Sequence, residues 1–142
     1  MGLAENRGFL LLMAPTWWIW EEQMRFLWVG LAGAVGAIAR YAIGSAVDQS
    51  RFPWATMGIN LSGALLLGFF LAVALGHLPV SVMTPIAVGL IGGFTTFSTF
   101  AWEAFTMSRA GRTWPAAIYV AVSVIGGLLA AWAGYSTGRA VN

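Results

Sequence analysis

The apolar stretch at residues 82–107 carries at its centre the feature that most restricts the fold of this chain. Residues 92–100 have the sequence GGFTTFSTF, which puts a glycine pair and four hydroxyl side chains into a run long enough to cross a bilayer. About 20 apolar residues suffice for a membrane-spanning helix. Polar or irregular backbone is tolerated at membrane depth only where protein buries it or where it lines a wet cavity. The centre of this stretch therefore predicts a pore or an ion site.

The composition indicates a membrane protein and excludes several other classes. Of the 142 residues, 59% are hydrophobic and 8% are charged, whereas soluble domains carry about 25% charged residues. The basic residues are all arginine and stand singly between apolar runs, so they form no basic face for nucleic acid. One histidine and no cysteine leave no convincing metal-ligand set or catalytic nucleophile. We therefore expect neither a nucleic-acid-binding protein nor an enzyme.

Four apolar spans organise the chain into one membrane domain. They cover residues 26–47, 54–75, 82–107 and 114–137, and the segments between them carry turn residues and charges. Glycine recurs along the spans, and small residues allow helices to pack closely in lipid. These observations predict an all-α membrane protein with four transmembrane helices, a break in the third helix, and a transmembrane domain over residues 24–142.

The first 23 residues differ from the rest of the chain. Their apolar part, residues 9–14, is too short to span a bilayer, and no small-residue cleavage pattern follows it. Met24 opens directly into the first span. Our hypothesis is that residues 1–23 are an N-terminal extension and that Met24 is the natural start, which N-terminal mass spectrometry of the native protein would test.

The orientation of the chain in the membrane is weakly specified. Four spans put both termini on one side, together with Arg7, Arg25 and Arg139. The other side carries Arg51, Arg109 and Arg112, and Arg40 lies near that end of the first span. The excess of positive charge that normally fixes orientation is therefore small. Four short helices also enclose little volume, and two-fold dimers are the commonest oligomers. Insertion in both orientations would permit an antiparallel dimer.

Three uncharged polar side chains in the spans are candidates for a pore lining. Asn60 lies in the middle of the second span. It either forms hydrogen bonds that join two helices or serves as a donor in a pore. Tyr119 and Ser123 are one helical turn apart in the fourth span, so their hydroxyls share a face. Amide and hydroxyl donors without fixed charge suit a small, strongly hydrated anion that must shed water and still leave.

The interrupted segment offers two further groups. Phe97 and Phe100 share a face if the helix resumes there. Their rings either pack in the core or present their positive edges to an anion. The glycine pair followed by two threonines either frees carbonyl oxygens, which commonly bind Na⁺ in membrane proteins, or only kinks the helix.

Arg40 and Glu103 are the ionisable residues nearest the membrane interior. A charge at that depth is costly and is usually paired or functional. Arg40 is close enough to the end of the first span to snorkel to the surface, and there it would attract anions to a vestibule. Glu103 would repel an anion, so we favour a structural pairing role for it.

The motif at residues 92–100 resembles the signature of the Fluc fluoride channels, also called the CrcB family. Three further patterns fit the same family, one in each of the other spans. They are Gly33-x-x-Gly36-Ala37-x-x-Arg40, Asn60-Leu61-x-Gly63 and Tyr119-x-x-x-Ser123. The similarity covers about residues 24–139, in the order and with the spacing of the family.

The resemblance implies a fluoride-selective channel that exports cytoplasmic fluoride passively across the cell inner membrane. It also implies a dual-topology antiparallel homodimer with a central Na⁺. The implied fluoride-binding positions are Asn60, Phe97, Phe100, Tyr119 and Ser123 in the pore and Arg40 in the vestibule. The backbone carbonyls of Gly92 and Thr95 would bind the Na⁺. Some family members carry a further hydroxyl one turn beyond Ser123, where this chain has Gly127.

Two other functions compete with the channel. A small dual-topology secondary transporter, a drug/proton or fluoride/proton antiporter, is also built from four short helices. Such a transporter depends on an acidic residue in the membrane as its proton carrier, yet the first span has none and Glu103 comes late in the third. A non-conducting subunit of a membrane complex would not explain the polar residues together with the broken third helix.

Overall fold

The computed structural model describes residues 17–49 and 51–141 and folds them into helices joined by short turns. Four helical stretches are long and apolar enough to cross a membrane: Glu22–Ala46, Trp54–Ala74, Val80–Arg109 and Thr113–Ala140. The four spans predicted from the sequence are confirmed, with bounds that shift by a few residues.

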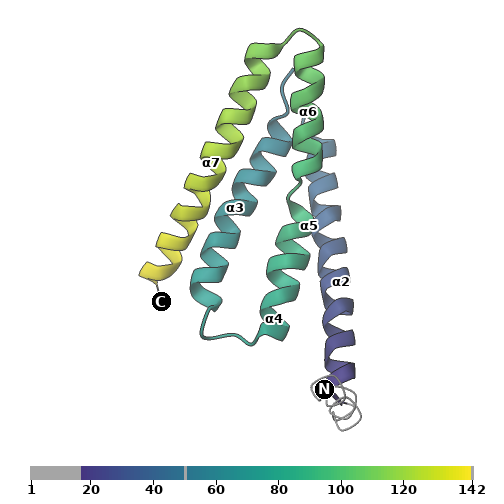
Figure 1. Cartoon of the computed structure of the whole chain (residues 1–142), viewed down its shortest axis with the longest axis vertical. Helices are drawn as coiled ribbons and strands as arrows, with labels where there is room; N and C mark the ends of the chain where they lie inside the picture. Colours follow the sequence, from purple (N-terminus) through teal and green to yellow (C-terminus); the bar gives the residue numbers. More distant parts are fainter. Residues whose placement is uncertain (1–16, 50, 142) are drawn as a thin grey trace, which may run out of the picture.

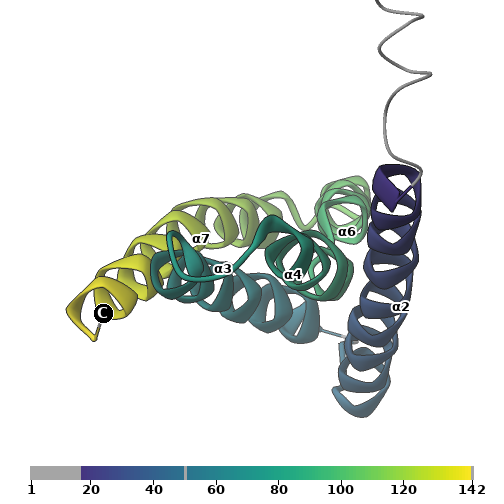
Figure 2. The ribbon, with the colours of Figure 1, turned by 90° about the horizontal axis from the view of Figure 1, so that it is seen from below.

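Three of the spans are single helices, and the third span is divided. The elements are α2 (Trp17–Ala46), α3 (Trp54–Ala74), α4 (Val80–Thr84), the π-helix η1 (Pro85–Ile91), α5 (Gly92–Phe94), α6 (Phe97–Arg109) and α7 (Thr113–Ala140). Successive spans run in opposite directions, so the start of α2 and the end of α7 lie at the same end of the bundle (Figure 1). Along the bundle, α7 packs beside α3, and the third span lies between α3 and α2 (Figure 2).

Helix α2 starts earlier than the first predicted span. It begins at Trp17 and runs without interruption through Met24. Its 30 residues give it a length of about 45 Å at the usual rise per residue, more than the ~30 Å of a bilayer's hydrocarbon core. Residues 1–16 lie outside the described part of the chain. The N-terminal extension and the start at Met24 stay predictions.

Glycine allows the helices to approach backbone to backbone. A Cβ atom at Gly36 of α2 would collide with the Leu90 carbonyl oxygen of η1, and one at Gly134 of α7 would collide with the Leu65 carbonyl oxygen of α3. These contacts confirm the close packing predicted from the small residues. The close packing is local, because a Cβ atom at Gly30 would meet nothing within 4 Å.

The third helix is broken, as predicted, and the break follows the glycine pair. Gly92 and Gly93 are still helical, whereas Thr95 (φ −80°, ψ 163°) and Thr96 (φ −151°, ψ 114°) are extended. The helix resumes at Phe97, where the Thr96 hydroxyl accepts a hydrogen bond from the Thr99 amide at 3.3 Å. Threonine is a favoured N-cap because its side-chain oxygen satisfies one of the free amides of the first turn. The threonines therefore form the break. Gly93 brings α2 close to it, because a Cβ atom there would lie 2.6 Å from the Gly33 carbonyl oxygen.

The buried core of the chain is small. One cluster of buried side chains joins α6 to α7 and consists of Phe100, Met107, Ala116 and Tyr119. Most of the large apolar side chains are exposed instead. Helices that are apolar all round are typical of membrane spans, whose outer surface meets lipid.

Candidate functional site

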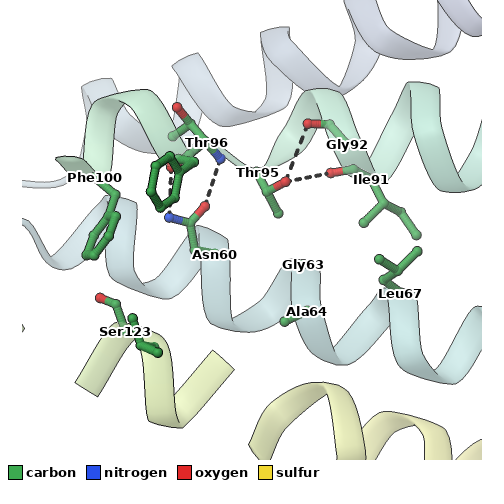
Figure 3. Close-up of a pocket in the computed structure, with 12 residues that line it drawn as sticks. Asn60, Gly63, Ala64, Leu67, Ile91, Gly92, Thr95, Thr96, Phe100 and Ser123 are labelled. Carbon is green, nitrogen blue, oxygen red and sulfur yellow. Dashed lines mark hydrogen bonds between the residues drawn. The ribbon is translucent and has the colours of Figure 1, made fainter. Parts of the chain in front are cut away.

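The break in the third span opens into a groove of about 380 Å³ between α3, the third span and the middle of α7 (Figure 3). The groove brings together six of the side chains or backbone positions predicted to form the site: Asn60, Gly92, Thr95, Phe97, Phe100 and Ser123. Two other predicted residues, Arg40 and Tyr119, do not line it. The groove is mainly apolar, with a few polar atoms.

Asn60 of α3 holds the break by pairing with one peptide unit. Its Nδ2 donates to the Thr96 carbonyl at 3.0 Å, and the Thr96 amide donates to its Oδ1 at 2.8 Å. These bonds replace helical hydrogen bonds that the extended backbone cannot make. A side-chain amide has two N–H donors, so one donor of Asn60 stays available at the groove. Asn60 therefore both supports the break and lines the groove.

The Thr95 hydroxyl lies at the break beside two backbone carbonyl oxygens and forms hydrogen bonds with them. Its Oγ1 lies 3.2 Å from the Ile91 carbonyl and 3.4 Å from the Gly92 carbonyl (Figure 3). The longer contact is at the limit for a hydrogen bond, so the Gly92 oxygen keeps most of its capacity to bind a cation. No cluster of three or more His, Cys, Asp or Glu side chains occurs among the described residues. Any cation held at the break would depend on backbone and hydroxyl oxygens.

Phe97 and Phe100 share a side of α6, as predicted, but differ in burial. Their ring centroids are 5.7 Å apart. The Phe97 side chain is 78% exposed, while Phe100 is 8% exposed and packs edge-on against Tyr119 with centroids 5.1 Å apart. Phe100 is thus both a core residue and a wall of the groove. Phe97 projects from the chain at the level of the break.

Tyr119 and Ser123 are one turn apart on α7 and face different surroundings. The Tyr119 hydroxyl is buried and donates to Glu103 Oε2 at 2.7 Å. The Ser123 hydroxyl faces the groove, opposite Asn60 and Phe100 in Figure 3. Ser123 Oγ is shielded from solvent and has no hydrogen-bond partner. Between these two residues, it is Ser123 whose hydroxyl keeps an unused O–H donor at the groove.

Glu103 of α6 is paired with hydroxyl groups, and no arginine within residues 17–49 and 51–141 forms an ion pair with it. Thr56 Oγ1 donates to its Oε1 at 2.8 Å, and Tyr119 donates to its Oε2. The structural pairing role expected for Glu103 is therefore confirmed. Sequence reasoning missed Thr56, which lies 47 residues away along the chain. The only available signal was that a carboxylate at membrane depth needs donors from another helix.

Arg40 of α2 reaches the break from the side opposite the groove. Its Nε donates to the Gly93 carbonyl at 3.2 Å. The rest of the side chain lines a second cavity of about 310 Å³, whose polar members include Thr96, Thr99 and Glu103. Arg40 therefore contacts the helix end that precedes the break and puts a positive charge into this second cavity.

Comparison with known proteins places these features in a family. The family model described as "CrcB-like protein, Camphor Resistance (CrcB)" matches residues 27–135. The chain belongs to the CrcB-like family. This family match spans all the residues named above, from Arg40 to Ser123.

Named relatives in this family are about as long as the matched segment. The fluoride-specific ion channel FluC of Acidobacterium capsulatum is 38% identical over 123 residues, which cover 83% of this chain and 98% of that protein. The fluoride-specific ion channel FluC 2 of Moorella thermoacetica is 41% identical over 116 residues, or 79% of this chain and 94% of that protein. The fluoride-specific ion channel FluC 2 of Rhodococcus jostii is 42% identical over 113 residues, or 79% and 96% of the two chains.

Proposed function

We propose that this chain is the subunit of a fluoride-specific channel in the inner membrane of a bacterium. Fluoride moves through it passively, down its electrochemical gradient, so that the cell is protected from fluoride accumulation. The observation that carries this proposal is the groove at the break, which is lined by Asn60, Ser123, Phe97 and Phe100. Its donors carry no fixed charge, and a pore must bind its ion strongly enough for entry and weakly enough for exit. Relatives at about 40% identity are named for fluoride.

An antiparallel dual-topology homodimer is the second part of the proposal. Phe97 is 78% exposed, and the extended backbone at Thr95 and Thr96 opens into a groove on the surface of the single chain. Asn60 satisfies the backbone groups of Thr96, but irregular backbone is not found facing lipid, and each polar group of the groove left unpaired there costs several kcal/mol. A second copy laid across the break removes that exposure. The weak charge bias between the two ends supports insertion in both orientations.

A structural Na⁺ at the dimer interface is the third part. The carbonyl oxygens of Gly92 and Thr95 would hold it, and unwound carbonyls are the usual Na⁺ ligands in membrane proteins. The donor set fits this ion, because no carboxylate, imidazole or thiolate cluster occurs in the described part of the chain. Two carbonyls are too few for a complete shell, so the ion requires the second copy. Its contribution would be to hold the two breaks together.

Proton-coupled transport is the weaker alternative. Its proton carrier would have to be Glu103, the acidic residue furthest inside the described spans. Both oxygens of Glu103 accept hydrogen bonds from neighbouring hydroxyls, and it does not line the groove at the break. A carboxylate held in this way is a structural anchor and not a mobile carrier. The pairing of Glu103 thus favours passive conduction.

Anion efflux from liposomes tests the channel directly. Purified protein is reconstituted with internal fluoride or chloride, and efflux is started with a K⁺ ionophore. We expect rapid loss of fluoride and no loss of chloride. Fluoride loss that requires a proton gradient would favour the antiporter. If well-folded protein releases neither anion, the channel proposal is wrong for this chain alone.

A further inference from the structure

The break leaves two neighbouring carbonyl groups of the third span without their helical donors. The Thr95 amide still makes a helical bond, at 3.1 Å, to the carbonyl four residues before it. In an unbroken helix the next two amides would bond to the carbonyls of Gly92 and Gly93. The extended conformation of Thr95 and Thr96 prevents both bonds. The carbonyl oxygens of Gly92 and Gly93 therefore need other partners.

Arg40 of α2 supplies a donor for one of these carbonyls. Its Nε donates to the Gly93 carbonyl at 3.2 Å. The helical part of the third span before the break covers residues 80–94, and we call it the first half-span. The carbonyl end of a helix carries partial negative charge, and arginine side chains near it bond to its last carbonyls. Arg40 therefore caps the first half-span, although it belongs to another helix.

The close packing of α2 on α5 puts Arg40 within reach of this carbonyl. Gly33, Gly36 and Arg40 lie on one face of α2, at positions i, i+3 and i+7. A Cβ atom at Gly93 would lie 2.6 Å from the Gly33 carbonyl oxygen, and one at Gly36 would lie 2.8 Å from the Phe94 amide nitrogen. The two backbones are thus in contact at the glycines. The side chain one turn beyond Gly36 reaches the end of the first half-span.

The Gly92 carbonyl lies on the other side of the helix end, at the groove. Successive residues of a helix are about 100° apart around its axis, so neighbouring carbonyls do not share a side. Gly92 and Thr95 both line the groove, and the Thr95 hydroxyl lies 3.4 Å from the Gly92 oxygen (Figure 3). The bond from Arg40 therefore fixes the helix end through one carbonyl and leaves the neighbouring carbonyl open to the groove.

We propose that Arg40 is a positioning residue, whose Nε caps the first half-span at Gly93 and so holds the Gly92 carbonyl at the groove for the cation. This inference rests on the proposed function, because it assigns Arg40 a role at the proposed Na⁺ site. The role belongs to one N–H donor. It is separate from attraction of anions into the second cavity, which depends on the charge of the guanidinium.

Two neutral variants separate the donor from the charge. In Arg40→Gln the amide nitrogen is the same number of bonds from Cα as Nε of arginine, so it can donate to the Gly93 carbonyl. In Arg40→Met a methyl group takes that place and no donor remains. Both variants lose the positive charge. Any difference between them therefore measures the contribution of the donor.

Hydrogen–deuterium exchange of the full chain in detergent without Na⁺ measures the cap, because fraying of the first half-span frees the Thr95 amide. In Arg40→Met we expect exchange of residues 92–97 to be roughly tenfold faster, the ratio that corresponds to a hydrogen bond from a charged group. Arg40→Gln should stay close to the parent, and exchange in α7 should not change. Arg109→Gln controls for the loss of an arginine and should match the parent, since Arg109 is at the far end of α6.

Titration of the unfolding temperature with Na⁺ is the second measurement. If the cap holds the Gly92 carbonyl in place, the Na⁺ concentration for half-maximal stabilisation should rise several-fold in Arg40→Met. Arg40→Gln should bind Na⁺ as tightly as the parent or more tightly, because the donor remains and a nearby positive charge is gone.

Each outcome decides the role of Arg40. Equal exchange in the Gln and Met variants would overturn the cap, and faster exchange with an unchanged Na⁺ response would overturn the positioning of Gly92. An unfolded Arg40→Met beside a folded Arg40→Gln supports the proposal, whereas two unfolded variants would overturn it. If the parent does not respond to Na⁺, the proposed Na⁺ site is wrong, and the exchange measurement still decides whether Arg40 caps the break.

Discussion

The side-chain amide of Asn60 forms two hydrogen bonds with the peptide unit of Thr96, one in each direction. Nδ2 donates to the Thr96 carbonyl at 3.0 Å, and the Thr96 amide donates to Oδ1 at 2.8 Å. A peptide unit in a helix would make both bonds along its own backbone. At the break α3 supplies them instead, so the extended conformation of the third span depends on one side chain of the second span.

Replacement of Asn60 by Leu, of similar size, should therefore loosen the break. It leaves the Thr96 N–H and C=O without their partners, at a cost of about 1–3 kcal/mol for each buried group. We expect lower thermal stability in detergent together with loss of fluoride efflux. Ser62→Ala is the control, because the Ser62 hydroxyl bonds only within α3, to the Ile59 carbonyl at 3.1 Å. A stable Asn60→Leu protein would contradict the supporting role.

Local features of the sequence were sufficient to predict the spans, the break and the shared face of Phe97 and Phe100. Hydropathy and helical periodicity act over neighbouring residues, so they can be recognised without a structure. The alternatives for Asn60 were a hydrogen-bonded link between helices or a donor in a pore. Its side chain does link α3 to the third span and also lines the groove, and its role in a pore stays a prediction. The glycine pair pointed to the right region, although the extended residues are Thr95 and Thr96.

Contacts between distant residues could not be predicted in the same way. Thr56 and Glu103 are 47 residues apart, and Arg40 and Gly93 are 53 residues apart. Which helix faces supply these partners depends on how α2 and α3 pack against the third span. Tyr119 shows the consequence, since its hydroxyl was predicted beside that of Ser123 and instead bonds to Glu103.

Removal of single hydroxyl groups should distinguish the roles of Tyr119 and Ser123 on α7. Tyr119→Phe deletes a 2.7 Å bond to a carboxylate, and bonds to charged groups contribute about 1.5–3 kcal/mol. Ser123 Oγ has no partner, so Ser123→Ala should leave stability unchanged or raise it slightly. Because that hydroxyl is the unused donor at the groove, Ser123→Ala should still slow fluoride efflux.

Thermal unfolding and efflux measured on the same preparations check this pair. The expected pattern is low stability for Tyr119→Phe, and normal stability with slow efflux for Ser123→Ala. Normal efflux of Ser123→Ala would show that its hydroxyl is not used by the anion. Unchanged stability of Tyr119→Phe would show that Thr56 alone satisfies Glu103.

The two phenylalanines should respond differently to replacement by isoleucine. Phe97→Ile and Phe100→Ile should both reduce fluoride efflux, because an aliphatic side chain has no positive ring edge to present to an anion. Only Phe100→Ile should also lower the unfolding temperature, since Phe100 is 8% exposed against 78% for Phe97. Loss of its edge-on contact with Tyr119 costs about 0.5–1.5 kcal/mol. Unchanged efflux in both variants would refute the aromatic role, and size-exclusion chromatography checks that assembly is intact.

A methyl group at Gly36 should be far more disruptive than one at Gly30 of the same helix. At Gly36 it would collide with the Leu90 carbonyl oxygen and lie 2.8 Å from the Phe94 amide nitrogen, whereas at Gly30 it would meet nothing within 4 Å. Overpacking of this kind typically costs about 1–3 kcal/mol, while Ala in place of an exposed helical Gly gains about 0.5–1 kcal/mol. Thermal unfolding of Gly36→Ala and Gly30→Ala should therefore shift in opposite directions. Equal shifts would mean that α2 does not pack this closely on η1.

Removal of Na⁺ should destabilise the assembled protein if the carbonyls of Gly92 and Thr95 hold the ion. A ligand that binds only the folded state at 100 times its dissociation constant adds about 2.7 kcal/mol. Protein purified in N-methylglucamine chloride should therefore unfold at a lower temperature, and Na⁺ should restore the loss along a saturable curve. Because the donors are backbone atoms, Thr95→Val should retain this response, although it loses the hydroxyl bonds to the Ile91 and Gly92 carbonyls. If Na⁺ and N-methylglucamine at the same concentration raise the unfolding temperature equally, the effect is one of ionic strength, and the proposed Na⁺ site is wrong.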